Sequence, residues 1–219
     1  MPEGGAGSAT GDLDTQTPVT DTGDGATEAG PDPTTKRRTG RSWLIELVVI
    51  VVVVLGASFL VRTFVVQTFY IPSGSMIPTL QVGDRILVDK LSYHLHGVGR
   101  ADIVVFTKPP LEHQQINDLV KRVIGLPGET ISTVNGQVYI NGKLLREPWL
   151  QPGVETTPGP DPVPFNLDKP YKIPAGEYYV MGDNRTDSED SRWFGPIPRS
   201  LIVGRAFIRI WPLSHIGGL

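Results

Sequence analysis

Two serines flank a single glycine in the proline-bounded segment Pro72-Ser-Gly-Ser-Met-Ile-Pro78, and a serine hydroxyl can act as a nucleophile. Gly74 between them permits backbone conformations closed to other residues and lets another chain come close. Met76 and Ile77 add an apolar wall of the kind that lines binding sites. Ser75 is therefore a candidate nucleophile, although the same tripeptide also occurs in ordinary turns.

A serine nucleophile needs a base, and histidine is the usual one. None of the chain's histidines adjoins a carboxylate in a recognisable triad arrangement; they are His94, His96, His113 and His215. The His94-x-His96 pair supplies two metal ligands without a third. The sequence therefore favours a base other than histidine, and it predicts no metal and no cofactor.

Lys121 offers an alternative base. It lies in Leu119-Val-Lys-Arg-Val-Ile124, where a strand would place it on one face with Leu119 and Val123. Loss of hydration on an apolar face lowers the pKa of a lysine and makes its free amine available as a general base. The other interpretation is an exposed lysine on an edge strand. Arg122 points to the opposite face and is expected in a solvated ion pair.

A third polar segment, 180–195, follows a predicted strand and is dense in Asp, Asn, Ser and Arg. This composition is typical of an internally hydrogen-bonded loop, in which Asp190 and Arg192 can pair. Its carboxylates do not have the spacing of a calcium-binding loop. The segment is therefore expected to support a site rather than to bind a cation.

Short β-branched or aromatic runs between turn residues predict the strands that must position these groups, at 85–89, 102–106, 119–124, 177–181 and 205–210. Two Asn-Gly pairs within 133–145 predict hairpin turns. Residues 147–174 are rich in proline and form a long excursion. The predicted fold is mainly β, an antiparallel sheet domain over 67–219.

The N-terminal part has a different composition. Residues 1–35 carry almost no large apolar side chains and are expected to be disordered, while Lys36, Arg37, Arg38 and Arg41 form a basic flank that completes a tail over 1–42. The apolar run that follows, closed by Arg62, predicts a transmembrane helix at 43–66. Basic residues before the helix place the tail in the cytoplasm and the β domain outside. A cleaved signal peptide and a buried core helix are the competing interpretations.

Composition excludes several classes of function. The chain has no cysteine, so disulfides, thiolate metal sites and a cysteine nucleophile are ruled out. A formal net charge of -3 gives no general basic field, and nucleic acid is not expected as a partner. The oligomeric state is left open.

Together these segments, in this order behind a predicted anchor, resemble the bacterial type I signal peptidases. Three motifs carry the resemblance: Pro72-Ser-Gly-Ser-Met-Ile-Pro-Thr-Leu80 with Gly83-Asp84, Lys121-Arg-Val-Ile-Gly-Leu-Pro-Gly128, and Gly182-Asp-Asn-Arg185 with Ser188-Glu-Asp-Ser-Arg192. Asp102-Ile-Val-Val-Phe106 matches a further box, and two aspartates common in the family are replaced by Glu129 and Thr186.

The resemblance implies roles for particular residues. Ser75 is the nucleophile, Lys121 its general base and Ser73 a second oxyanion donor. Ser188 orients the lysine, and Asp190 and Arg192 form a supporting ion pair. Shallow pockets for small substrate residues are implied, with walls at Phe69, Ile71, Met76, Leu80, Ile86, Val105, Asp118, Leu119 and Val120.

The implied enzyme is a serine endopeptidase that removes signal peptides from exported preproteins at the bacterial cell membrane. Its partners would be these preproteins and membrane lipid, which a single-pass anchor brings together. One alternative is a self-cleaving repressor-type Ser/Lys protease, for which no DNA-binding module is visible. Another is an anchored β domain that only binds, with Ser75 and Lys121 structural.

Overall fold

The computed structural model describes residues 40–112 and 116–219. The predicted tail at 1–35, the basic residues 36–38 and His113 lie outside the described residues. Contacts divide the chain into two units, Met1–Glu46 and Leu47–Leu219, and every described strand belongs to the second. The candidate site residues therefore all lie in one unit.

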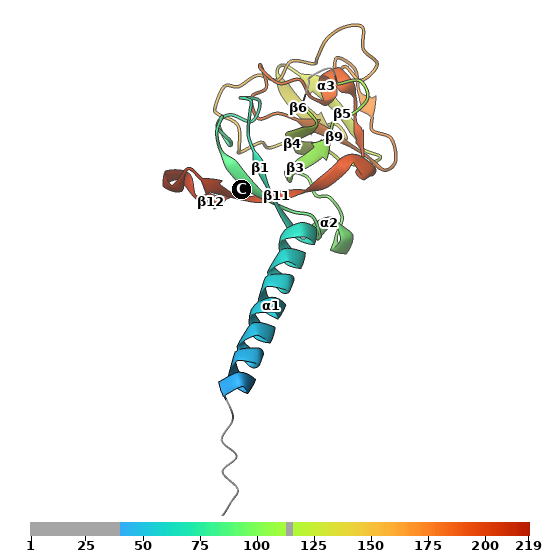
Figure 1. Ribbon diagram of the computed structural model, residues 1–219. Helices are drawn as coiled ribbons and strands as arrows, with labels where there is room; N and C mark the ends of the chain where they lie inside the picture. Colours follow the sequence, from blue (N-terminus) through green and yellow to red (C-terminus); the bar gives the residue numbers. More distant parts are fainter. Residues whose placement is uncertain (1–39, 113–115) are drawn as a thin grey trace, which may run out of the picture. The chain divides into compact units, whose positions relative to one another are not determined.

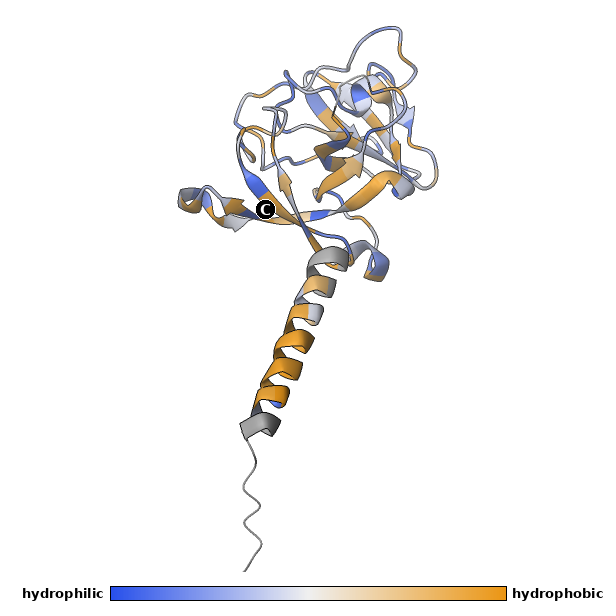
Figure 2. Cartoon of the chain, viewed as in Figure 1, coloured by the Kyte–Doolittle hydropathy of each residue, from blue (hydrophilic) through white to orange (hydrophobic). Residues whose placement is uncertain are grey.

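One long helix, α1 (Gly40–Phe64), begins the described chain. Its middle turns are apolar (Figure 2), and large side chains from Trp43 to Phe59 are exposed. The helix ends at Phe64 and β1 begins at Val66. Within the described residues, no helix combines the length and apolarity that a membrane crossing requires.

The larger sheet is antiparallel throughout and has the strand order β1-β2-β11-β3-β4-β9-β10, with β12 added to β11. Figure 1 labels β1, β3, β4, β9, β11 and β12 of this sheet. Its strands are β1 (Val66–Tyr70), β2 (Arg85–Asp89), β3 (Ile103–Thr107), β4 (Asp118–Gly125), β9 (Glu177–Met181), β10 (Ile197–Pro198), β11 (Ile202–Trp211) and β12 (Gly217–Gly218). Short helices lie between strands: α2 (Ser92–Leu95), α3 (Ser191–Phe194), and the 3-10 turns Arg199–Leu201 and Leu213–His215.

A second antiparallel sheet has the order β7-β6-β5-β8, formed by β5 (Thr130–Val134), β6 (Gln137–Ile140), β7 (Lys143–Leu144) and β8 (Tyr171–Lys172). The two Asn-Gly pairs make its turns as predicted, because all four residues have the positive φ that such hairpin turns require. The excursion over 147–174 is not detached from the sheets. It returns as β8 beside β5 and buries Phe165, Leu167 and Ile173.

Three apolar clusters hold the domain together, and β4 contributes to more than one. One cluster contains Leu119 and Val123, and a second contains Ile124 together with residues of the small sheet. The end of β4 is therefore covered on both faces, and Lys121 to Gly125 are all buried. A charged residue in this stretch has to find its partners inside the protein.

Candidate active site

Ser75 lies in the connection between β1 and β2, in a tight turn. The Ile77 N–H donates to the Gly74 carbonyl at 3.1 Å, and the Leu80 N–H to the Met76 carbonyl at 2.9 Å. Gly74 does not have a positive φ, contrary to the expectation from the sequence. What limits this position is space, since an added Cβ would come within 3.1 Å of the Ile77 side chain.

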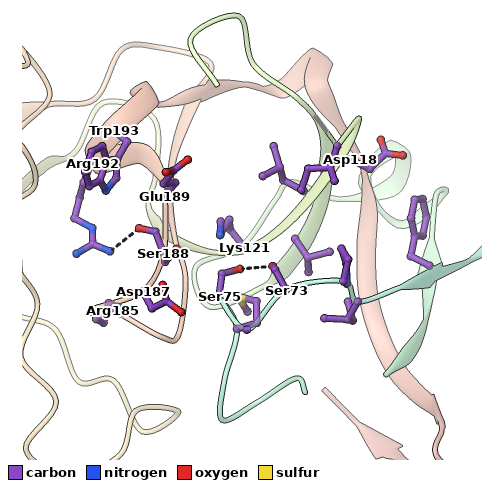
Figure 3. Close-up of a pocket in the computed structure, with 18 of the residues that line it drawn as sticks. Ser73, Ser75, Asp118, Lys121, Arg185, Asp187, Ser188, Glu189, Arg192 and Trp193 are labelled. Atoms are coloured by element: carbon purple, nitrogen blue, oxygen red, sulfur yellow. Dashed lines mark hydrogen bonds between the residues drawn. The ribbon is translucent and has the colours of Figure 1, made fainter. Parts of the chain in front are cut away.

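The hydroxyls of Ser73 and Ser75 point to the same cleft. Ser73 Oγ donates to Ser75 Oγ across 3.4 Å, the interaction drawn at the centre of Figure 3. The turn thus presents two hydroxyls side by side.

Lys121 extends from β4 into the middle of this cleft, with Ser75, Ser73 and Ser188 around it (Figure 3). The residue is only 2% exposed, which confirms that it lies on the buried face shared with Leu119 and Val123. It faces Val104 of β3, and β9 begins to pair with β4 only at the next residue. Lys121 therefore stands where β4 loses one neighbouring strand and a cleft opens.

Burial is the main influence on the Lys121 amine, and it lowers the pKa of the group to about 8. Asp190, Glu112 and Glu189 oppose this shift, while Arg192 adds to it. A lysine of this kind is partly neutral near physiological pH and can accept a proton.

Asp190 and Arg192 form the predicted ion pair, with Arg192 Nη2 2.8 Å from Asp190 Oδ2. Asp190 also caps α3 by accepting from the Arg192 N–H, and it accepts from the Gly182 N–H at 3.0 Å. Burial alone would raise the pKa of the Asp190 carboxyl, but Arg192, together with Lys121 and the Gly182 N–H, outweighs this effect and holds that pKa below its ordinary value. The pair is thus a fixed, nearly neutral unit beside the lysine.

Ser188 lies beside this pair, and its hydroxyl is buried without a hydrogen-bond partner among the described residues. It lies against Gly182, where an added Cβ would come within 2.2 Å of Ser188 Oγ and 2.4 Å of the Ser75 carbonyl oxygen. Only glycine fits between the two serine-bearing segments. The orienting role implied for Ser188 stays a prediction.

Asn184 fixes the backbone of the serine turn from the same loop. Its N–H donates to the Ser75 carbonyl at 3.0 Å, and its side-chain amide donates to the Gly74 carbonyl at 3.1 Å. These two bonds hold the turn relative to the loop that carries Ser188. The sequence showed Asn184 only as part of a motif, without this function.

The expectation of a solvated ion pair at Arg122 is wrong in one respect. Arg122 does pair, with Nη2 2.6 Å from Asp183 Oδ2, but it is 6% exposed. Its guanidinium also lies over the Trp149 ring, and Thr79 donates to Asp183 at 2.5 Å. The reason is the small sheet and the excursion, which cover the face of β4 that would otherwise meet water.

The cleft has a volume of about 550 Å³ and includes Ser73, Ser75, Lys121, Ser188 and Arg192 among its lining residues. Six residues predicted as pocket walls also line it: Phe69, Ile71, Met76, Asp118, Leu119 and Val120. Three others do not; Leu80, Ile86 and Val105 are buried in the apolar cluster behind Ile71 and Met76. Substrate contact by these three stays a prediction. Thr157 and Trp193 line the cleft without having been predicted.

One wall of the cleft has an incompletely paired strand. β4 pairs with β3 from Asp118 onward, whereas its pairing with β9 begins at Arg122. Along 118–121 the backbone is thus paired on one side only among the described strands. Such an edge can accept an extended peptide as an additional strand.

The described residues contain no group of three or more His, Asp or Glu side chains able to hold a metal ion. His94 and His96 are both exposed at the end of α2, and the His96 ring makes an edge contact with Tyr93.

An antiparallel β domain with paired serines and a buried lysine in one cleft defines a candidate serine hydrolase of the Ser/Lys type. The family described as "Signal peptidase, peptidase S26" matches residues 44–211. A "Signal peptidase I" of Leptolyngbya laminosa is 44% identical over 173 residues, covering 77% of this chain and 78% of that protein. The chain belongs to this family of signal peptidases, which are serine endopeptidases.

A second relative supports the same family. A "Signal peptidase I" of Bacillus caldolyticus is 39% identical over 184 residues, covering 82% of this chain and 95% of that protein. A solved structure of a signal peptidase I from Enterococcus faecalis V583 is 28% identical and covers 50% of this chain and 97% of that chain, with a TM-score of 0.38.

Proposed function

We propose that this chain, a signal peptidase I by family, removes N-terminal signal peptides from exported preproteins with Ser75 as nucleophile and Lys121 as general base. The observation that carries the assignment is a lysine buried at the centre of a cleft into which two serine hydroxyls project. A buried cation is costly, and a lysine whose pKa is lowered by burial inside a cleft is typical of a catalytic amine.

In the first half of the reaction, neutral Lys121 accepts the proton of the Ser75 hydroxyl as Oγ attacks the scissile carbonyl carbon. The Ser73 hydroxyl and the Ser75 N–H stabilise the negative charge that develops on the carbonyl oxygen. Protonated Lys121 then gives its proton to the leaving amine, and the C–N bond breaks. The product is an acyl-enzyme on Ser75 and a free mature N-terminus.

In the second half, Lys121 accepts a proton from water as that water attacks the acyl carbon. The proton returns to Ser75 Oγ when the ester bond breaks, which releases the signal peptide and regenerates the enzyme. No group beyond the two side chains is needed for proton transfer. Ser188 and the Asp190–Arg192 pair keep the lysine in place.

Substrate recognition follows from the open edge of β4. The residues before the cut extend along 118–121 as an added strand, with alternate side chains directed into the cleft. Its apolar wall is formed by Phe69, Ile71, Met76 and Leu119, which leave room for small side chains. Selection of small residues before the cut is therefore expected.

We further propose that the chain is a single-pass protein of the bacterial cell membrane, with 1–42 in the cytoplasm and the β domain outside. The apolar run 43–61 between Arg41 and Arg62 supports this orientation. About a dozen residues separate Arg62 from Ser75, so an anchored enzyme would act close to the membrane surface. Protease treatment of intact cells tests it, and protection of the β domain from outside would reverse the orientation.

The dyad is tested by cleavage of a preprotein with the detergent-solubilised full chain and its Ser75→Ala and Lys121→Met variants. Both variants should lose at least about a thousandfold in kcat, because nucleophile and base act as a unit. Cleavage by either variant at the wild-type rate would disprove the assignment and favour a domain that only binds. The control is Ser132→Ala, since this serine lies on β5 of the small sheet and outside the cleft.

A further inference from the structure

The proline-rich excursion contributes a short segment to the cleft, Thr156–Gly159, which we term the bracing segment. It is attached to the small sheet, because the Thr156 N–H donates to the Gly136 carbonyl at 2.9 Å. It is also attached to the loop after β9, because Arg185 donates to Thr156 Oγ1 at 2.6 Å. Arg185 pairs in turn with Glu147 at the start of the excursion. The segment is thus fixed from two sides.

Thr157 is the residue of this segment that meets the catalytic loop. Arg192 Nη1 donates to Thr157 Oγ1 at 3.1 Å and to the Thr157 carbonyl at 3.3 Å. The other two guanidinium nitrogens of Arg192 donate to Asp190, each at 2.8 Å. Arg192 is therefore held between Thr157 on one side and Asp190 on the other.

Gly159 supports the same arginine by close packing. An added Cβ at Gly159 would lie 2.9 Å from both the Cβ and the carbonyl oxygen of Arg192. The residue also has a φ of 108°, which a side chain rarely tolerates. The segment therefore contacts Arg192 along its backbone as well as at its guanidinium.

Arg192 and Asp190 matter for the reaction because they face Lys121. The charged groups that act on the lysine are Asp190 and Arg192 around α3, Glu189 on the preceding loop, and Glu112 on the segment after β3. Three are carboxylates that favour the protonated lysine, and Arg192 is the cation that offsets them. If the guanidinium moved away from Asp190, its positive charge would offset the carboxylates less, and the protonated form of Lys121 would be favoured.

We propose that Thr157 is a positioning residue for the Ser75/Lys121 site, acting by holding the Arg192 guanidinium against Asp190. The proposal rests on the proposed function, since it requires Lys121 to be the base. It assigns the excursion a part in catalysis, although the excursion lies outside every motif that carries the resemblance to the family.

The test is the pH dependence of kcat and kcat/KM for Thr157→Val and Thr157→Ser in the solubilised full chain. Valine keeps the shape of threonine and removes the hydroxyl that accepts from Arg192, leaving only the longer bond to the Thr157 carbonyl. Thr157 is exposed, so folding should persist. With Arg192 less firmly held, the midpoint of the profile should move upward by roughly one pH unit, which lowers kcat about tenfold at pH 7. The rates of variant and wild type should converge near about pH 10. Serine retains the hydroxyl and should restore the wild-type profile.

Gly159→Ala provides a second variant: its added Cβ would push against the Cβ and the carbonyl oxygen of Arg192 and so displace the guanidinium, while the Thr157 hydroxyl is kept. The same upward shift of the midpoint is expected. An unchanged midpoint in Thr157→Val, or an equal loss of rate at every pH, would overturn the proposal. The Lys121→Met variant distinguishes failure of the role of Thr157 from failure of the proposed function. If that variant stays active, the dyad fails; if it is inactive while Thr157→Val behaves as wild type, only the role of Thr157 fails.

Discussion

Lys121 combines two properties that oppose each other, a charge and a buried position. Four charged groups act on its amine, Asp190, Glu112 and Glu189 against the effect of burial and Arg192 with it, and burial has the largest influence. If this position served only the stability of the protein, a lysine directly bonded to a carboxylate, or an apolar side chain in its place, would stabilise the fold more. Its depressed pKa thus has consequences for both activity and stability.

Activity should follow the neutral fraction of the Lys121 amine. With a pKa lowered to about 8 by burial, kcat/KM should rise tenfold per pH unit and level off above pH 8. At pH 6 it should lie about 100-fold below the plateau. Initial rates on a soluble peptide between pH 6 and pH 10 measure this. A midpoint near the ordinary lysine value of 10.5 would contradict it.

Substitution of Lys121 should have opposite effects on activity and on stability: the activity is lost, whereas the folded protein becomes more stable. The folded pKa of Lys121 lies below its unfolded value of 10.5, so the unfolded state binds more protons between about pH 8 and 10.5. Below about pH 8 the full penalty for a buried cation applies, and above 10.5 it disappears. Lys121→Met should therefore raise the free energy of unfolding at pH 7 by up to about 3 kcal/mol, with the gain shrinking toward alkaline pH.

Urea unfolding of Lys121→Met and Ser75→Ala at pH 7 and pH 10 measures this difference. Ser75→Ala is the control, because it removes activity without removing a buried charge, and its stability should stay within about 0.5 kcal/mol of wild type. A Lys121→Met protein less stable than wild type at pH 7 would show that the amine contributes favourable interactions that outweigh its burial.

At the scale of elements, the loop Gly182–Arg185 connects four parts of the domain through consecutive residues. Gly182 lies against Ser75 and Ser188, and Asp183 binds Arg122 and Thr79. Asn184 binds the serine turn, and Arg185 binds the excursion. The position of Ser75 relative to Lys121 thus depends on contacts between segments far apart in the sequence.

Asp183→Asn should destabilise the domain strongly, because it leaves Arg122 buried without a counter-charge. Loss of one partner of a buried pair costs about 3–5 kcal/mol, whereas an exposed pair contributes about 1 kcal/mol or less. Arg205→Gln is the matched control, since its pair with Asp102 is 3.1 Å long and Arg205 is 41% exposed. Thermal unfolding of both variants decides the matter. Equal shifts in their midpoints would contradict the prediction.

Some strands could be predicted from the sequence and others could not. The bounds of β2 and β9 were predicted correctly, because β-branched and aromatic runs between turn residues mark them. β10 and β12 were missed, since Pro198 and two glycines disfavour a strand locally and only pairing with β9 and β11 creates one. Lys121 was placed on the correct face by alternation within its strand.

The prediction that Arg122 lies in a solvated ion pair was wrong about the solvation. Alternation predicts two faces of a strand but not what covers each of them. Here the small sheet and Trp149 cover the second face. Thr157 gave no signal at all, because its contact with Arg192 joins residues 35 positions apart across a stretch without periodicity. Contacts of this kind require the folded chain.

At the scale of the whole molecule, the β domain that carries the cleft follows an apolar run at 43–61. Every cleft residue lies between Phe69 and Trp193, so the chemistry does not need the segment before Val65. The proposed anchor instead makes enzyme and substrate meet more often, because an enzyme and a signal peptide held in one membrane plane have a raised effective concentration. Anchoring should therefore change the cleavage of membrane-bound substrates and leave soluble ones unaffected.

A chain beginning at Val65 should cleave a soluble peptide with kcat/KM within about twofold of the full chain, because the cleft is retained. On a preprotein inserted in lipid vesicles, the same chain should be slower by roughly 100-fold, which is the lower end of the gain that tethering gives. Full-length Ser75→Ala, which keeps the apolar run, is the control and should cleave neither substrate. If the shortened chain cleaved the vesicle-bound preprotein as fast as the full chain, the run at 43–61 would have no part in bringing enzyme and substrate together. Loss of activity on both substrates would instead indicate that residues before Val65 are needed for the fold of the cleft itself.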